Sequence, residues 1–436
     1  MNDIKELIGK VGSFEILTES TSISFDGTII DNGKNIVVYG RIDVEKARSL
    51  DYWKKYRIIG DVNSVEITLI DASILCSQRI DDRLSATLKA EPPEIIIGRK
   101  IIDDGSIRIA SMELPEITWF FSEPAFEEVI DFNKESPVLL KYCFPDDITV
   151  NDELGTLVIS RCLKYSPMKA KVEYTSVPVL MYKFNEPVSI NTARKQMAKA
   201  RNLFLFFADG YLPLNDIDFE DEEETGENYS PFCRFKLIFN FAEECKVIDE
   251  PFFVTTSLVR TDMQSIWDKW GELYSHRFIS AIYYEVIRNR ATWINMFLNF
   301  TQAIELFENT YRSDYLKKNK NGDPYFEECI RDALTQLNAE LSLSYDQIKN
   351  VVTKIKNARH FFTHYSGRRT EPTYHEVFAM CRVLHLTFLG LIYKQLGIPD
   401  KAITEAKERR GYSVFDKDIS IILRQPVDNV DYMAFF

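Results

Sequence analysis

The chain has 436 residues, of which 45% are hydrophobic and 27% charged, an ordinary balance for a globular protein with two or three domains. Its formal net charge of -13 argues against unspecific coating of nucleic acid, so any contact with a polyanion is expected in a local patch. No early apolar run resembles a signal peptide, and no run approaches the roughly 20 residues of a membrane span. We therefore expect a cytoplasmic protein without a membrane partner.

Seven cysteines are scattered along the chain without a C-x-x-C pair. An odd, dispersed set predicts reduced thiols and argues against a disulfide framework or a zinc ribbon. We expect neither a bound metal nor a cofactor. The cysteines are Cys76, Cys143, Cys162, Cys233, Cys245, Cys329 and Cys381.

Residues 1–165 contain short β-branched or alternating segments separated by Gly, Asn and Asp turns. This pattern predicts a β-rich domain, either a sandwich or an open barrel. An Asn-Gly pair at Asn32 and Gly33 stands between two such segments and is a strong hairpin signal. No glycine-rich nucleotide loop occurs here. The expected strands are Ser22–Asp31, Asn35–Arg41, Ser64–Leu69, Glu94–Ile97, Ser106–Ile109, Ile117–Phe121 and Leu157–Ser160.

Residues 166–254 mix strand and helix patterns and are expected to form an α+β extension of the N-terminal region. The helix has Ser189 or Asn191 as its cap. The acidic run Asn215–Asn228 is expected to be a self-repelling, disordered loop. The expected elements are a strand near Val172–Tyr182, a helix over Ile190–Phe207 and a strand over Phe235–Phe241.

From Thr255 onward the apolar periodicity becomes helical, so residues 255–436 are expected to form an all-α, up-and-down bundle. Lys317–Pro324 is expected to be a solvated loop within it. The expected helices are Thr261–Tyr274, Phe278–Asn289, Thr292–Tyr311, Tyr325–Glu340, Tyr345–His364, Thr373–Leu396 and Pro399–Arg409.

The helix predicted over Tyr345–His364 has signals at both ends. Ser344 and Gln347 have the spacing of a capping box, and Gly367 is a candidate left-handed stop. Apolar residues recur at helical spacing, so one face is expected to be buried. The apolar residues are Ile348, Val351, Val352, Ile355, Ala358 and Phe362.

Three side chains near the end of this helix are candidates for chemistry. At about 100° per residue, His360 and His364 are neighbours on the polar side. Arg359 falls on the apolar stripe, where an unpaired guanidinium is costly. Histidine is the side chain best suited to proton transfer near neutral pH.

Every charged side chain from residue 349 to 369 is basic, although the protein as a whole is acidic. Such a local stripe is the electrostatic footprint of a phosphate-bearing partner, while a solvated helix face is the plain alternative. The stripe comprises Lys349, Lys354, Lys356, Arg359, Arg368 and Arg369.

Two segments carry a resemblance to a known family. The hexapeptide Arg359–His364, RHFFTH, fits the R-polar-x-x-x-H signature of HEPN ribonuclease domains, and Ile355–Tyr365 resembles the family's motif helix. Phe297–Arg312, FLNFTQAIELFENTYR, resembles an earlier family helix with a Q-A-x-E core. The flanks are similar to the HEPN domain of ApeA-type anti-phage proteins from about Val259 onward, and the rest is similar in general layout.

This resemblance implies a metal-independent endoribonuclease that acts in abortive infection. His364 would be the main acid/base, Arg359 the phosphate clamp and His360 a polar auxiliary. Arg359 and His364 lie about 140° apart on an ideal helix. In HEPN proteins two motif helices face each other across a homodimer, which would complete the site.

Partners follow from the same resemblance. RNA would be the substrate, with Lys349, Lys356, Arg368 and Arg369 binding its backbone. The N-terminal region would sense a phage-derived trigger and restrain the nuclease. The acidic stretch Asp216–Glu227 is opposite in sign to the basic stripe and is expected to contribute modestly to that restraint.

Two other functions remain open at this point. His360 and His364 form H-x-x-x-H, which can hold a metal, but the zincin class needs Glu where this chain has Phe361. A HEPN domain can also be a non-catalytic nucleotide-binding, RNA-binding or scaffold module.

Overall fold

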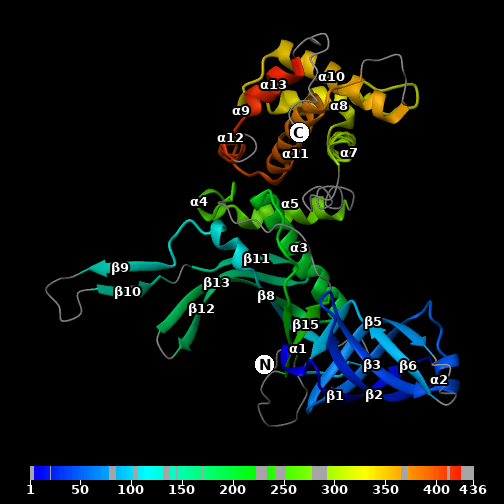
Figure 1. Ribbon diagram of the computed structural model, residues 1–436. Coiled ribbons are helices and arrows are strands. Elements are labelled where there is room, and N and C mark those ends of the chain that lie inside the picture. Colours follow the sequence, from blue (N-terminus) through cyan, green and yellow to red (C-terminus); the bar gives the residue numbers. More distant parts are fainter. Residues whose placement is uncertain are drawn as a thin grey trace, which may run out of the picture. The chain divides into compact units, whose positions relative to one another are not determined.

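The computed structural model divides the chain into two compact units (Figure 1). A β-rich unit comprises residues 1–118, 123–201 and 212–244, and a helical unit comprises residues 119–122, 202–211 and 245–436. The residues described are 4–19, 21–77, 85–101, 106–130, 138–143, 146–168, 171–221, 233–240, 252–276, 292–364, 371–409 and 413–423.

Six strands of the β-rich unit close into an antiparallel barrel (Figure 1). Their order is β5-β4-β1-β2-β3-β6, and a further pairing between β5 and β6 closes the ring, which leaves no free edge within it. The sequence predicted a sandwich or an open barrel, and closure refines that expectation. The strands are β1 (Val11–Leu17), β2 (Ser22–Asp31), β3 (Ile36–Asp43), β4 (Lys55–Val62), β5 (Val65–Ser77) and β6 (Ser85–Glu91).

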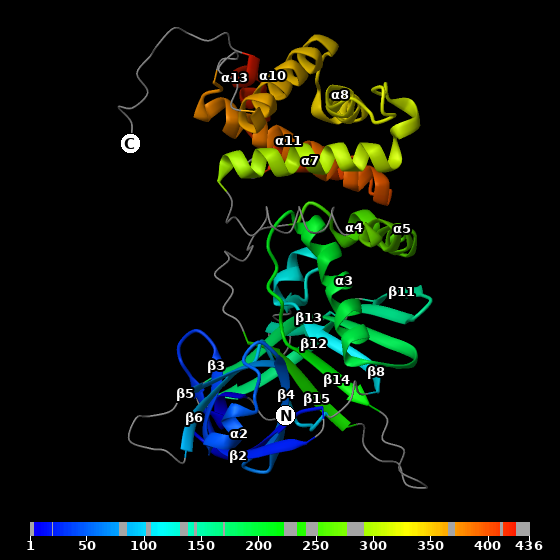
Figure 2. The same cartoon turned by 90° about the vertical axis from the view of Figure 1, so that its right-hand side faces the viewer.

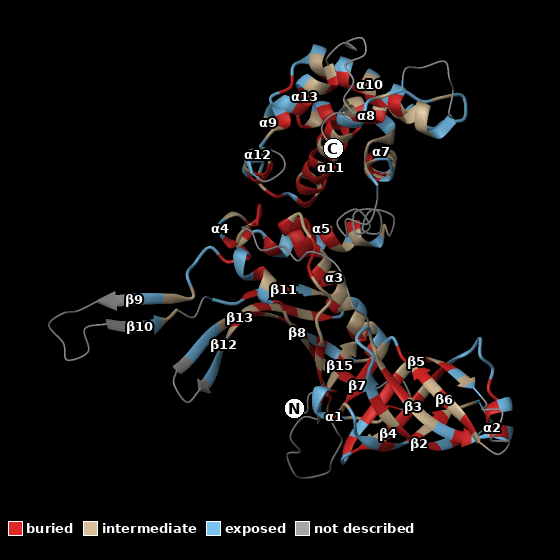
Figure 3. Cartoon of the chain, viewed as in Figure 1, coloured by how far each residue is buried: buried red, intermediate tan, exposed pale blue. Residues whose placement is uncertain are grey.

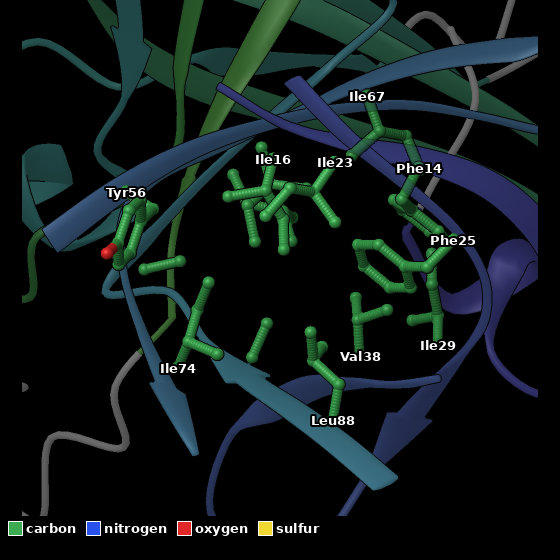
Figure 4. Close-up of a cluster of buried hydrophobic side chains, with 14 of the residues drawn as sticks. Phe14, Ile16, Ile23, Phe25, Ile29, Val38, Tyr56, Ile67, Ile74 and Leu88 are labelled. Carbon is green, nitrogen blue, oxygen red and sulfur yellow. The ribbon is translucent and has the colours of Figure 1, made fainter. Parts of the chain in front are cut away.

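Apolar side chains fill the interior of the barrel, as Figure 4 shows. The burial of β1 and β2 alternates residue by residue, because successive side chains of a strand point to opposite faces. The rings of Phe14 and Phe25 stack inside, with centroids 5.5 Å apart. The Asn-Gly pair forms the predicted β2–β3 hairpin, in which Gly33 has a positive φ of 82°.

The sheet continues from β5 through seven more strands in the order β7-β15-β14-β8-β13-β12-β11. Separate from it, β9 (Phe126–Ile130) and β10 (Val138–Tyr142) form a two-stranded ribbon. The seven strands are β7 (Glu94–Ile97), β8 (Ile107–Glu113), β11 (Ile148–Asp152), β12 (Gly155–Met168), β13 (Lys171–Val188), β14 (Ile217–Asp221) and β15 (Cys233–Phe239). The short helices are α1 (Ile4–Leu7), α2 (Val44–Arg48) and the 3-10 turn η1 (Pro115–Phe120).

Two local predictions are wrong. The strand expected at Ile117–Phe121 is instead part of η1, because Ile117 and Phe120 are both buried at a spacing of three residues. The acidic run is not wholly a loop, since Ile217 and Phe219 alternate with its acids and are buried in β14. The remainder of that run, 222–228, lies outside the described residues.

The helix α3 (Ile190–Ala208) begins in the β-rich unit, and its last turns belong to the helical unit. Ser189 is its cap, because the Ser189 hydroxyl accepts a hydrogen bond from the amide of Thr192 at 3.2 Å. Phe204 and Phe207 of the last turns are fully buried, and both rings contact that of Phe120. Residues 119–122 and 202–211, which precede the helical region expected from the sequence, therefore contribute to the core of the helical unit.

The helical unit follows the predicted pattern closely. The helix expected over Tyr325–Glu340 is broken into two at Leu337, whose φ of -112° and ψ of 10° leave the helical path, and the left-handed Ser342 ends the second piece. The helix expected over Phe278–Asn289 lies outside the described residues, and α13 was not predicted. The helices are α4 (Thr256–Val259), α5 (Met263–Ser275), α7 (Trp293–Tyr311), η2 (Ser313–Tyr315), α8 (Phe326–Gln336), α9 (Asn338–Leu341), α10 (Tyr345–His364), α11 (Tyr374–Leu396), α12 (Lys401–Glu408) and α13 (Phe415–Leu423).

The core of this unit is built around α11, which lies beside α7 (Figure 2). A capping box of Thr373 and Glu376 starts α11, and the left-handed Gly397 ends it. Contrary to the sequence expectation, α11 is long and apolar enough to cross a membrane. However, 78% of its most apolar window is buried inside the unit, as the red of Figure 3 shows, so it serves as a core helix.

Candidate functional site

The helix α10 has the predicted start and the predicted buried face. The amide of Ser344 donates to Gln347 Oε1 at 2.8 Å, and the amide of Gln347 donates back to Ser344 Oγ at 3.3 Å. This reciprocal pair is the capping box. Five apolar residues from Ile348 to Ala358 are buried, which fixes the rotation of the helix and turns its last polar residues outward.

The helices α8 and α10 pack together (Figure 1). A pocket of about 480 Å³ lies where the end of α10 meets the start of α8. It gathers the arginine and both histidines of the predicted catalytic set. Its lining residues are Tyr325, Phe326, Glu327, Lys356, Arg359, His360, Thr363 and His364.

The two histidines form an adjacent pair in this pocket. The ring centroids of His360 and His364 lie 4.7 Å apart, and the ring planes make an angle of 55°. His364 is exposed, whereas His360 is half-buried. The i,i+4 spacing predicted this neighbourhood. An exposed imidazole next to a second one is an arrangement that can accept and donate protons.

The position of Arg359 on the apolar stripe is explained by two contacts within the chain. Its guanidinium donates to Glu305 Oε2 at 2.7 Å, and its Cζ lies 4.1 Å from the centroid of the Phe326 ring. The side chains of Arg359 and Glu305 are 27% and 26% exposed. The carboxylate compensates the charge and the ring covers one face of the fork, so no second chain is needed to explain this arginine.

Arg359 and His364 line one pocket despite the wide angle between them on the helix. The angle describes only the directions of the Cα–Cβ bonds. The Arg359 side chain crosses to Phe326 at the start of α8, so the second wall of the pocket comes from another helix. Helix spacing alone does not reveal this convergence.

Three cations of the basic stripe form ion pairs with carboxylates of other helices, so the stripe is less positive than its sequence suggests. Lys354 pairs with Glu376 at 3.4 Å, Lys356 pairs with Glu327, and Arg359 pairs with Glu305. These carboxylates come from α11, α8 and α7, which the sequence separates from the stripe. Lys349 is exposed. The predicted RNA-binding residues Arg368 and Arg369, and the candidate stop Gly367, lie outside the described residues.

A polar network links α7 and α8, and its Glu308 is fully buried. Gln336 Nε2 donates to Glu308 Oε1 at 2.9 Å and to Asp332 Oδ2 at 3.0 Å, and Arg312 Nε donates to Asp332 Oδ2 at 3.0 Å. Burial, followed by the proximity of Asp332, raises the pKa of Glu308 to about 8. Glu308 lies one turn after Glu305 on α7, so the network links α7 to α8 near the carboxylate that pairs with Arg359.

Three contributors to the site were not singled out in the sequence. Glu305 lies in the Q-A-x-E core, so that core was a usable signal for it. Phe326 and Glu327 carry no such signal, because their place depends on the turn that precedes α8. Among the residues that the structure describes, no group of three or more His, Cys, Asp or Glu side chains could hold a metal ion.

The acidic stretch has partners of its own within the β-rich unit. Lys236 lies 3.8 Å from Asp216 and 3.7 Å from Asp218, and Arg234 lies 2.8 Å from Glu220. Three acids of the described part of the stretch therefore already have basic partners on the neighbouring strand β15. This weakens the expectation that it pairs with the basic stripe.

Comparison with known families gives two matches. The model described as ApeA N-terminal domain 1 matches residues 9–270, more than half of the chain, and the model described as Apea-like HEPN matches residues 298–402. The second match contains Glu305, Tyr325, Arg359 and both histidines of the pocket.

No curated protein matches the chain. Among solved structures, YcgR of Escherichia coli in complex with c-di-GMP is 11% identical, with a TM-score of 0.18 over 46% of this chain and 87% of that one. MrkH of K. pneumonia is 12% identical, with a TM-score of 0.17 over 46% and 88%. These scores are too low to support a conclusion about fold or function.

Proposed function

The chain belongs to the ApeA-like HEPN defence proteins, and on that premise we propose that its helical unit is a metal-independent endoribonuclease. The observation that carries the proposal is the pocket in which Arg359, His360 and His364 meet. An arginine fork and two imidazoles are the groups that phosphodiester transfer to a 2′-hydroxyl requires.

In the proposed reaction the RNA 2′-hydroxyl attacks the adjacent phosphorus. The O2′–P bond forms while the P–O5′ bond breaks, which leaves a 2′,3′-cyclic phosphate and a 5′-hydroxyl. His364 serves as the main acid/base, His360 is its auxiliary, and one proton is taken from O2′ while one is given to O5′. Arg359 binds the phosphate oxygens and stabilises the charge that develops on them.

The proposal places two copies of α10 face to face in a homodimer. Each chain supplies one arginine and one histidine pair, and a composite cleft would place an acid and a base on opposite sides of the phosphate. His364 is exposed at the end of its helix, as such a cleft requires. Light scattering that showed an active monomer at assay concentration would contradict this part of the proposal.

We further propose a role in abortive infection, in which the β-rich unit restrains the nuclease until a phage-derived trigger is sensed. Lys349 and Lys356 would contribute to binding of the RNA backbone. Because Lys356 already pairs with Glu327, we expect its contribution to be small at moderate salt.

The test is cleavage of mixed cellular RNA by purified full-length variants. His364→Ala and Arg359→Ala should each lower the rate by about 10²–10⁴-fold, and His360→Ala should lower it less. His375→Ala is the matched control, because His375 is also exposed on a helix but does not line the pocket. Near wild-type cleavage by His364→Ala would overturn its assigned role.

A second candidate function is an RNA-binding module without catalysis. The observation in its favour is that Arg359 already pairs with Glu305 of the same chain, which argues against its catalytic role at a reacting phosphate. This reading predicts RNA binding with no cleavage under any condition, so the same assay separates the two.

A further inference from the structure

The pocket has an exposed aromatic side chain that the proposed chemistry does not use. Tyr325 lines the pocket beside Arg359 and His364 and is 48% exposed. An exposed aromatic face next to a phosphate-binding group is the arrangement that stacks an unpaired base. Resting on the proposed function, we propose that Tyr325 is a base-stacking subsite that makes the nuclease select unpaired RNA.

The backbone of Tyr325 is held rigidly although its ring is exposed. Its amide donates to the carbonyl of Lys317 at 3.0 Å, and its carbonyl accepts from the amides of Glu328 and Cys329 at 2.9 and 3.2 Å. Tyr325 is thus the N-cap residue of α8, and both its amide and its carbonyl form hydrogen bonds. An ordered main chain lowers the conformational entropy that is lost when a base stacks on the ring.

Of the tyrosine and the phenylalanine that line the pocket, Tyr325 is the more exposed residue. The neighbouring Phe326 ring is covered by the guanidinium of Arg359. Tyr325 and Arg359 line the same pocket, so a base on the tyrosine ring and a phosphate at the guanidinium would share one site.

The loop before Tyr325 extends this surface with positive charge. Lys317, Lys318 and Lys320 are all exposed there. The loop is ordered by a bridge between Lys318 and Pro324 and by a hydrogen bond of 2.7 Å from the amide of Asn319 to the carbonyl of Asp323. Lys318 pairs with Asp314 of η2 at 3.6 Å, and the loop itself carries one acid, Asp323.

These features define a path for a single strand. Phosphates would follow the lysines of the loop, a base would stack on Tyr325, and the next phosphate would enter the pocket at Arg359. A paired base has its faces covered by its neighbours in the helix and cannot use the ring. Duplex RNA is therefore expected to bind without help from Tyr325.

The experiment measures binding of the full-length protein to a fluorescent 2′-O-methyl RNA, which lacks the attacking hydroxyl and stays intact. Tyr325→Ala should weaken binding of an unpaired oligonucleotide about tenfold or more, and Tyr325→Phe should retain it. Tyr345→Ala is the control, because Tyr345 is 75% exposed at the opposite end of α10. Thermal unfolding shows that the variants are folded.

Two further probes separate the contribution of base stacking from the contribution of phosphate binding. An oligonucleotide of abasic sites and a blunt-ended duplex should each bind wild type and Tyr325→Ala equally, since neither offers an unpaired base. An equal loss for all probes would overturn base stacking, as would no loss for the unpaired probe.

Parallel cleavage assays with ordinary RNA keep this inference distinct from the proposed function. Normal cleavage by wild type with no effect of Tyr325→Ala on binding overturns the subsite and leaves the nuclease. Tyr325-dependent binding without any cleavage leaves the subsite and overturns the nuclease. Absence of binding to every probe overturns the subsite.

Discussion

Arg359 has its geometry set by a residue 54 positions earlier in the chain. Glu305 holds the guanidinium at 2.7 Å while Phe326 supports its face, so the fork is oriented before any substrate arrives. Preorganised donors are worth more than mobile ones, because they need no reorganisation as charge develops. The cost is electrostatic, since the carboxylate competes with the phosphate for the same arginine.

Glu305→Gln tests this dual effect. The amide keeps the shape and one acceptor but removes the negative charge, so RNA should bind more tightly while the cleavage rate falls about tenfold or more. Single-turnover kinetics separate the two quantities. A purely structural role would change neither binding nor rate in the folded protein, and an unchanged rate would contradict a positioning role for Glu305.

The raised pKa of Glu308 predicts that the stability of the folded protein depends on pH. Its pKa of about 8 in the folded state lies above the ordinary value of 4.5, so the folded protein binds this proton more tightly than the unfolded chain does. The stability that this proton contributes to the folded protein is fully present below about pH 4.5 and is lost as the pH rises through 8. Glu308→Gln should therefore raise the Tm relative to wild type by about 3 °C or more at pH 8 and change it little at pH 5. Equal differences at both pH values would contradict the assigned protonation.

At the scale of elements, the start and the buried face of α10 together determine where the residues of the site lie. Its capping box lies about five turns before His364, and its buried stripe fixes the face on which the histidines appear. Ser344→Ala should destabilise the protein by about 1 kcal/mol, as measured by chemical unfolding. Because Ser344 is far from the pocket, cleavage by the folded variant should equal that of wild type. A loss of activity at temperatures where it remains folded would show that the start of α10 has another role.

The elements that local signals specify were predicted well. The bounds of β2, β7 and α10 agree with the sequence patterns, because alternation, periodicity and caps are encoded within a few residues. Closure of the barrel through β5 and β6 and the contact of Glu305 with Arg359 depend on packing between distant segments. The paired acids of β14 were also missed, because a charge run does not reveal its partners on the adjacent strand.

At the scale of the whole molecule, the helical unit is not a continuous piece of sequence. Phe120, Phe204 and Phe207 precede residue 255 and are fully buried within that unit, and Tyr393 of α11 donates to the carbonyl of Phe206 at 2.7 Å. A fragment that starts at Thr255 removes these groups from the core. Large truncations of buried aromatic side chains cost about 3–5 kcal/mol each.

We therefore expect the fragment 255–436 to lack a cooperative thermal transition and to be harmless when expressed. This outcome would not disprove restraint by the β-rich unit, because the fragment cannot build its own core. The full-length protein is the control. A soluble fragment that unfolds cooperatively would contradict this description of the core.

The chemistry of the cleaved ends tests the central claim most directly. Full-length protein is incubated with RNA in excess chelator, and the termini of the fragments are identified. Proton transfer by His364 and charge stabilisation by Arg359 predict 2′,3′-cyclic phosphate and 5′-hydroxyl ends, formed at an undiminished rate by wild type and about 10²–10⁴-fold more slowly by His364→Ala. Fragments that end only in 3′-hydroxyl groups, or cleavage restored solely by divalent ions, would contradict a metal-independent ribonuclease.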